Sequence, residues 1–273
     1  MTASISTPSL STARMAGVGA RFAGVRPLVA KDIADWRHGR RLWIIVAVVT
    51  AFMALAAANN WIISQVIAAS PEIEAPATPM SMVPIDNVLA AVASQIFIFA
   101  AIFGSMSLIV AERERGTLSW VASKPVGRGG ILLAKWASAT LAIGLAAAVV
   151  PLAITLGVVS VLYGVPAVGA VVLMAVSMVA TIAFFVAVAV AVSTFVANQA
   201  AVAAIGFAVL LLPSIVGAVL PFDIGPFLPT SIVAWSIGLG LGAPVGVVTP
   251  IAWGVAMIAL GAIAAWRIDR IEL

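Results

Sequence analysis

The stretch AERERGTLSWVASKPVGRGGILLAK, residues 111–135, is a long charged island set between two extended apolar segments. Of the chain's 14 basic and 10 acidic side chains, seven lie in this island. Charged side chains are strongly disfavoured inside a bilayer. The island is therefore predicted to be a water-exposed loop between two membrane-spanning helices.

The composition of the whole chain points the same way. The chain has 273 residues, of which 63% are hydrophobic and only 9% are charged, whereas a soluble domain carries about 25% charged residues. We therefore expect an integral membrane protein. The formal charge of +4 does not indicate a nucleic-acid partner, because the basic residues flank apolar segments instead of covering one solvent face. The chain lacks cysteine and has a single histidine, His38, which excludes disulfides, thiolate metal sites and a histidine metal cluster.

Six segments are long and apolar enough to cross a bilayer, for which about 20 residues suffice. Turn residues separate the later segments, since Asp223 is the single charged residue between positions 136 and 266. Pro151 predicts a kink in the third segment. The predicted fold class is an all-α integral membrane protein with six transmembrane helices. The expected spans cover residues 42–67, 88–110, 136–162, 168–192, 200–220 and 247–266.

Two shorter segments complete the predicted organisation. The region before the first span carries seven basic residues and Trp36, which favours an interfacial helix; a charged flank that only anchors the span is the alternative. The apolar segment 230–239 is bounded by proline and glycine and is too short to cross, so we expect a re-entrant or surface-lying helix. The expected regions are a disordered cytosolic tail (1–13), a basic interfacial region (14–41), the six-span domain (42–266) and a cytosolic tail (267–273).

The distribution of charge predicts the orientation. With six spans, all 14 basic residues fall on one side of the membrane. The opposite side receives no lysine or arginine and holds four acidic residues, Glu72, Glu74, Asp86 and Asp223. Basic residues accumulate in cytoplasmic loops. The pattern predicts a multi-pass protein of the cytoplasmic membrane with both termini and the island 111–135 in the cytosol.

No catalytic motif is evident in the chain. None of its lysines is followed by serine or threonine, so a Walker A loop is absent. Glu112 and Glu114, at positions i and i+2, point to different sides of a helix and do not make a shared acid–base or metal site. The predicted spans contain no ionisable side chain, which disfavours an ion-coupled carrier. We expect a protein that is not an enzyme and that takes its energy from elsewhere.

The punctuation of the island predicts a short helix inside it. Gly116 is a good helix terminator, Thr117 can cap a new helix, and Pro125 stops that helix and disfavours helix at the preceding residue. An apolar face of this kind needs a partner, which is either another protein or, as Trp120 permits, the lipid headgroups. The expected apolar face consists of Leu118, Val121 and Ala122.

The island also resembles a known family. The run ERERGTLSWVASKPVGRGGILLAKW is similar to the loop after the second span in permeases of the ABC-2 family of ABC transporters. The shared pattern is an acidic residue, Gly-Thr-Leu, a proline with a basic residue, and a lysine that enters the third span. Here the pattern comprises Glu112, Glu114, Gly116, Thr117, Leu118, Pro125, Arg128 and Lys135.

This resemblance implies an architecture and a set of partners. The helix from Pro27 to Arg41 would be an elbow helix, the segment 230–239 an outer segment before the last span, and the short helix of the island a coupling helix that docks on a separate ABC ATPase. The partners would be two ATPase subunits, which bind ATP and Mg²⁺, and a second permease of the same or a sibling chain; this chain itself would hold no cofactor.

The expected function is that of a permease subunit, most simply of an exporter. A membrane scaffold or assembly factor is the alternative, followed by an ion-coupled secondary carrier. The expected ATPase-coupling interface comprises Glu112, Glu114, Arg115, Gly116, Thr117, Leu118, Val121, Ala122, Lys124, Pro125, Arg128 and Lys135.

Overall fold

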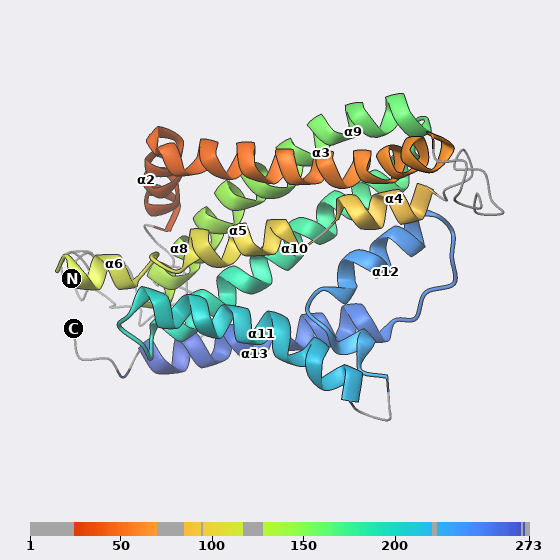
Figure 1. Cartoon of the computed structure of the whole chain (residues 1–273). Coiled ribbons are helices and arrows are strands. Elements are labelled where there is room, and N and C mark those ends of the chain that lie inside the picture. Colours follow the sequence, from red (N-terminus) through yellow and green to blue (C-terminus); the bar gives the residue numbers. More distant parts are fainter. Residues whose placement is uncertain are drawn as a thin grey trace, which may run out of the picture.

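A computed structural model of the chain describes residues 25–69, 85–93, 95–116, 128–219, 223–268 and 270. In these ranges the regular elements are all helical (Figure 1). Six helical segments are long and apolar enough to cross a membrane, which confirms the predicted all-α, six-span fold. They are Arg40–Ile63, Val88–Glu114, Gly129–Tyr163, Val168–Ser193, Gln199–Gly217 and Val248–Ile268.

The second span is a segmented helix. It consists of α4 (Ile85–Val92), α5 (Ile96–Ser105) and α6 (Val110–Glu114). At the second interruption, the Ser105 hydroxyl donates to the Ala101 carbonyl over 2.6 Å, and the Leu108 amide bonds the Ser105 carbonyl over 3.1 Å. Such side-chain bonds to the backbone compete with the helical ladder and often bend helices. The end of this span therefore leaves the membrane through a turn at residues 106–109.

The third span is irregular near the proline that the sequence singles out. It runs through α8 (Arg128–Gly144), the π-helical turn η2 (Leu145–Val149) and α9 (Val150–Tyr163). Proline has no amide hydrogen, so Pro151 leaves a gap in the helical ladder. π-turns are one of the usual ways in which a helix takes up such an irregularity.

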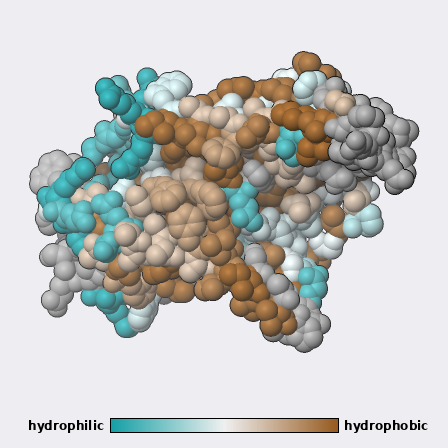
Figure 2. Space-filling view, viewed as in Figure 1, coloured by the Kyte–Doolittle hydropathy of each residue, from teal (hydrophilic) through white to brown (hydrophobic). Residues whose placement is uncertain are grey.

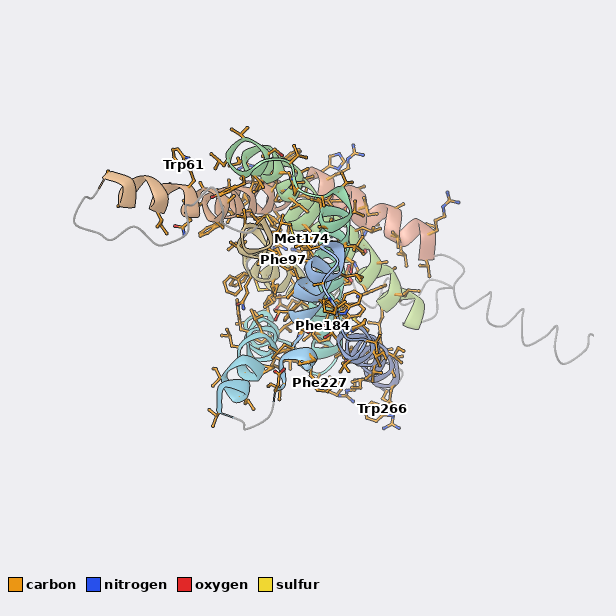
Figure 3. The ribbon with its side chains drawn as sticks, turned by 90° about the vertical axis from the view of Figure 1, so that its right-hand side faces the viewer. Trp61, Phe97, Met174, Phe184, Phe227 and Trp266 are labelled. Atoms are coloured by element: carbon orange, nitrogen blue, oxygen red, sulfur yellow. The ribbon has the colours of Figure 1, made fainter. Side chains whose placement is uncertain are left out.

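The remaining spans pack around one central helix. This helix is α10 (Val168–Ser193), and it packs against α5, α8, α11 (Gln199–Val219) and α13 (Val248–Ile268). Phe97 of α5 and Met174 of α10 are both buried in the interior (Figure 3). Trp61 of α3 (Arg40–Ala69) and Trp266 of α13 lie at the periphery and are exposed.

The outer surface of the bundle is apolar. Brown, hydrophobic side chains cover its middle, and hydrophilic ones gather at the end where α2 and α6 lie (Figure 2). Exposed apolar side chains on helices such as α3 and α13 suit a lipid environment, where the helical backbone is satisfied internally.

Functional elements collect at the polar end of the bundle, called the charged end below. It contains α2 (Val25–His38), α6, the first turns of α8 and the last turn of α13 (Figure 1). Helix α2 runs across the end of α3, and its main packing partner is α8. The predicted helix of the basic region is present and begins two residues before the expected proline.

A short helix lies at the opposite end. Helix α12 (Ser231–Gly240) follows the 3-10 turn η3 (Gly225–Phe227) and packs against α10. The Ser177 and Ser236 hydroxyls bond each other over 2.7 Å. At Gly240 an added Cβ would lie 2.4 Å from the Ala170 Cα, so glycine permits this close packing. The predicted short apolar helix before the last span is confirmed, one residue later than expected.

Candidate functional site: the charged end

The charged island begins as the sequence predicts. Helix α6 ends at Glu114, and the Gly116 amide closes a turn on the Arg113 carbonyl over 3.1 Å. Gly116 has φ of +67°, a left-handed value that glycine adopts readily. The predicted helix terminator is confirmed.

The middle of the island, residues 117–127, lies outside the described residues. The chain is described again from Arg128, which begins α8. The predicted coupling helix and its boundaries therefore stay predictions. The predicted interface residues concerned are Thr117, Leu118, Val121, Ala122, Lys124 and Pro125.

Three charged side chains from three helices meet at the charged end. Lys135 of α8 lies between Asp32 of α2 and Glu112 of α6. Its Nζ donates to Glu112 Oε1 over 2.5 Å and lies 3.2 Å from both Asp32 carboxylate oxygens. The side chains are only 10–19% exposed. We call Asp32, Glu112 and Lys135 the buried triad.

The position of Asp32 explains how α2 joins the triad. The side chains of α2 that face the bundle recur with helical spacing, and Leu28, Asp32 and Trp36 lie one turn apart on this stripe. The stripe packs on α8, which places the Asp32 carboxylate beside Lys135. The Ser138 hydroxyl, one turn along α8, is 3.4 Å from Asp32 Oδ2. A charged residue inside an otherwise apolar stripe thus finds its partners on the neighbouring helix.

The triad acts as a structural tie. Partly desolvated charges are tolerated when they are paired and hydrogen-bonded, and here one ammonium serves two carboxylates. Lys135 thereby connects α2 and the last turns of the second span to the start of the third. It holds no substrate atom in the structure, so its chemistry is that of a positioning residue.

A second contact joins the island to the turn between α10 and α11. Gln199 Nε2 donates to Glu114 Oε2 over 3.1 Å, and Glu114 points away from the triad. Glu112 and Glu114 therefore face different partners, as their i, i+2 spacing predicts. In the same region the Arg267 guanidinium of α13 lies 5.3 Å from the centre of the Phe195 ring. Side chains from α6, α11 and α13 meet at this end.

The structure brings together only part of the predicted interface. Glu112 and Lys135 meet in the triad, whereas Glu114 and Arg115 are exposed beside it. Sequence reasoning missed Asp32, Ser138 and Gln199. A signal existed for Asp32, which stands four residues from Leu28 and four from Trp36 on the predicted helix; Ser138 and Gln199 carry no comparable signal.

The lone charged residue of the segment 136–266 lies elsewhere. Asp223 is exposed and belongs to the opposite end of the bundle, where its Oδ1 accepts a hydrogen bond from the Gly225 amide over 2.7 Å. This contact caps the 3-10 turn η3, a common role for aspartate in turns. The geometry accounts for Asp223 as a turn residue.

Comparison with known proteins identifies the family. The model of the family described as ABC-2 family transporter protein matches residues 26–264. A comparison with curated proteins gives no significant match. The family match covers both the charged end and all six spans, including each member of the buried triad. The chain therefore belongs to the ABC-2 family of transporter proteins.

Proposed function

We propose that this chain is the permease subunit of an ABC exporter and that residues 111–135 dock a separate ABC ATPase. The family match over residues 26–264 carries the proposal. Six apolar helices supply the membrane domain. Two ATPase subunits, which bind ATP and Mg²⁺, and a second permease complete the proposed assembly.

The charged end is the proposed docking side, and it faces the cytosol of the cell. Basic side chains lie at this end, and the positive-inside rule favours a cytosolic location for it. The island leaves the bundle there at Gly116 and returns at Arg128. An apolar contact by the short helix would be small, so specificity needs fixed geometry and charge.

The buried triad gives the loop a mechanical connection to the transporter. Because Lys135 bonds both Asp32 and Glu112, a displacement of α6 is transmitted to α8 and to α2. In this proposal Glu112 and Lys135 position the loop, whereas Glu114, Arg115 and the short helix contact the ATPase.

The docking role predicts the effect of Leu118→Asp. The substitution places a carboxylate on the apolar face of the short helix, where it is desolvated on docking. We expect loss of ATPase copurification and a fall of at least about tenfold in association, the equivalent of about 1.4 kcal/mol. The measurement is affinity purification of the tagged permease from its native host, followed by a test of ATP hydrolysis in nanodiscs.

Leu118→Met is the matched control, because it keeps an apolar side chain of similar volume and should retain the ATPase. Thermal unfolding of both variants separately establishes that the membrane domain is intact. Wild-type association of Leu118→Asp would contradict the docking role. A permease that copurifies with no Walker A protein in its wild-type form would instead favour the scaffold alternative.

The proposed orientation predicts a labelling pattern. The chain has no cysteine, so single cysteines can be introduced without background. Ala75→Cys should react with an impermeant maleimide on intact cells. Ser123→Cys and Ala197→Cys should react only after permeabilisation, because the island and the α10–α11 turn are assigned to the cytosol.

Reaction of each variant in permeabilised cells is the control for accessibility, and Ala197 is exposed in the structure. Labelling of Ala197→Cys from outside intact cells would contradict the proposed orientation of the charged end.

A further inference from the structure

A cavity of about 520 Å³ opens beside the buried triad. Its volume falls in the range of about 300–1,000 Å³ that is typical of ligand sites. The walls come from α2, the first turn of α3, the turn at residues 106–109, α6 and the first residue of α11. Its arginines are Arg40, Arg41 and Arg115. We call this space the arginine cavity.

The three arginines have unused hydrogen-bonding capacity. Within the described residues, none of them has a carboxylate at ion-pair distance. Arg41 uses one nitrogen, since its Nη1 donates to the Ser107 hydroxyl over 2.9 Å, and a guanidinium has five N–H donors. Guanidinium groups bind phosphate oxygens in a bidentate manner.

The acidic side chains of the cavity are already engaged. Asp32 and Glu112 both bond Lys135. Asp35 is 68% exposed and lies 3.8 Å from Lys31, one turn away on the same helix. The carboxylates are thus partly neutralised by lysines, and the arginines dominate the potential that an anion would meet.

The arginine cavity lies at the depth of the lipid headgroups. Arg40 and Arg41 begin α3, and no charged residue follows until after the end of this helix at Ala69. The two arginines therefore mark the boundary between hydrocarbon and water. Half-buried Trp36, Leu108 and Ala111 add an apolar wall to the cavity, as an amphiphilic ligand would need.

We propose that the arginine cavity binds the phosphate of an anionic phospholipid. Arg41 and Arg115 approach from different elements and would bind the phosphate oxygens, with Arg40 at the membrane boundary. The glycerol and the first acyl carbons would lie against the apolar wall. Basic cavities between membrane helices are suited to such headgroups. A lipid held there would contact α2, α3 and α6 together and would stabilise their arrangement.

The test uses the purified full chain without any ATPase, so its outcome is independent of the proposed docking role. Phosphatidylglycerol or phosphatidylcholine is titrated separately, and bound lipid is counted by native mass spectrometry. We expect the wild type to prefer phosphatidylglycerol. Near a membrane surface each basic residue contributes about a fivefold effect on affinity, so Arg41→Gln/Arg115→Gln should lose about 25-fold in affinity for phosphatidylglycerol.

Arg26→Gln/Arg37→Gln is the matched control, because it removes the same charge from exposed positions of α2 that do not line the cavity. It should keep wild-type affinity. Arg41→Lys/Arg115→Lys keeps both charges and should retain the preference for phosphatidylglycerol, which tests the site even if the glutamine variant is unstable. Equal affinity of the wild type for both lipids, or equal losses in the glutamine variant and its control, would overturn the proposal.

Inorganic phosphate distinguishes a lipid site from a site for a free anion. Excess phosphate should leave phosphatidylglycerol bound, because it cannot use the apolar wall or the membrane. If inorganic phosphate displaces the lipid completely at millimolar concentration and binds the wild type alone, the cavity is a free-anion site and the lipid assignment is wrong.

Discussion

Replacement of Lys135 by methionine is expected to lower the free energy of unfolding by about 3–5 kcal/mol, the usual effect of removing one partner from a buried ion pair. The side chain is 12% exposed and bonds Glu112 and Asp32. Its loss leaves two carboxylates close together without a counter-charge. We expect α2 to detach from α8, seen as a lower unfolding temperature and as faster hydrogen exchange along α2.

Two comparisons make this expectation specific. Lys31→Met removes a lysine whose partner is 3.8 Å away and which is 61% exposed, so it should change the free energy by less than about 1 kcal/mol. Adding Asp32→Asn and Glu112→Gln to Lys135→Met should restore much of the stability, because no unpaired charge then remains. Equal effects of Lys31→Met and Lys135→Met would contradict the structural role of the triad.

Gly116→Val is expected to uncouple the ATPase while leaving the bundle folded. Gly116 has φ of +67°, which costs an ordinary residue about 1–2 kcal/mol and a β-branched residue more. An added Cβ would meet no neighbour within 4 Å, so the effect comes from the backbone alone. The strain changes the direction in which the loop leaves α6. The measurement is ATP hydrolysis stimulated by the permease in nanodiscs, for which we expect a fall of at least about tenfold.

Two glycine controls belong to this experiment. Gly116→Asn should keep more activity than Gly116→Val, because asparagine tolerates the left-handed conformation. Gly129→Val changes a glycine at the return of the same loop that has an ordinary φ and open space around it, and it should couple normally. Wild-type stimulation by Gly116→Val would show that the conformation of Gly116 is not needed for coupling.

The spans could be predicted from the sequence because length and apolarity decide them. The fourth span was expected at residues 168–192, and the structure has Val168–Ser193. Gly116 was equally accessible to prediction, since a glycine between a charged helix and a threonine has a local reason to end that helix.

Interactions between distant segments could not be predicted in the same way. Asp32 and Lys135 are 103 positions apart, and only the packing of α2 on α8 brings them together. From sequence, Asp32 looked like one of several charges on a surface helix. The interruption of the second span at residues 106–109 was hidden too, because the segment is apolar throughout and its hydrophobicity carries no sign of a turn.

The π-turn η2 sets the rotational phase of the third span. A π-turn holds one extra residue compared with an α-helical turn, and one residue corresponds to about 100° of rotation. Everything after Leu145–Val149 is turned by that angle relative to an uninterrupted helix. This offset lets one long span present a face to α2 and α10 through α8, and another to α3 and α4 through α9. A helical wheel drawn from Lys135 therefore assigns the wrong neighbours to every residue beyond the turn.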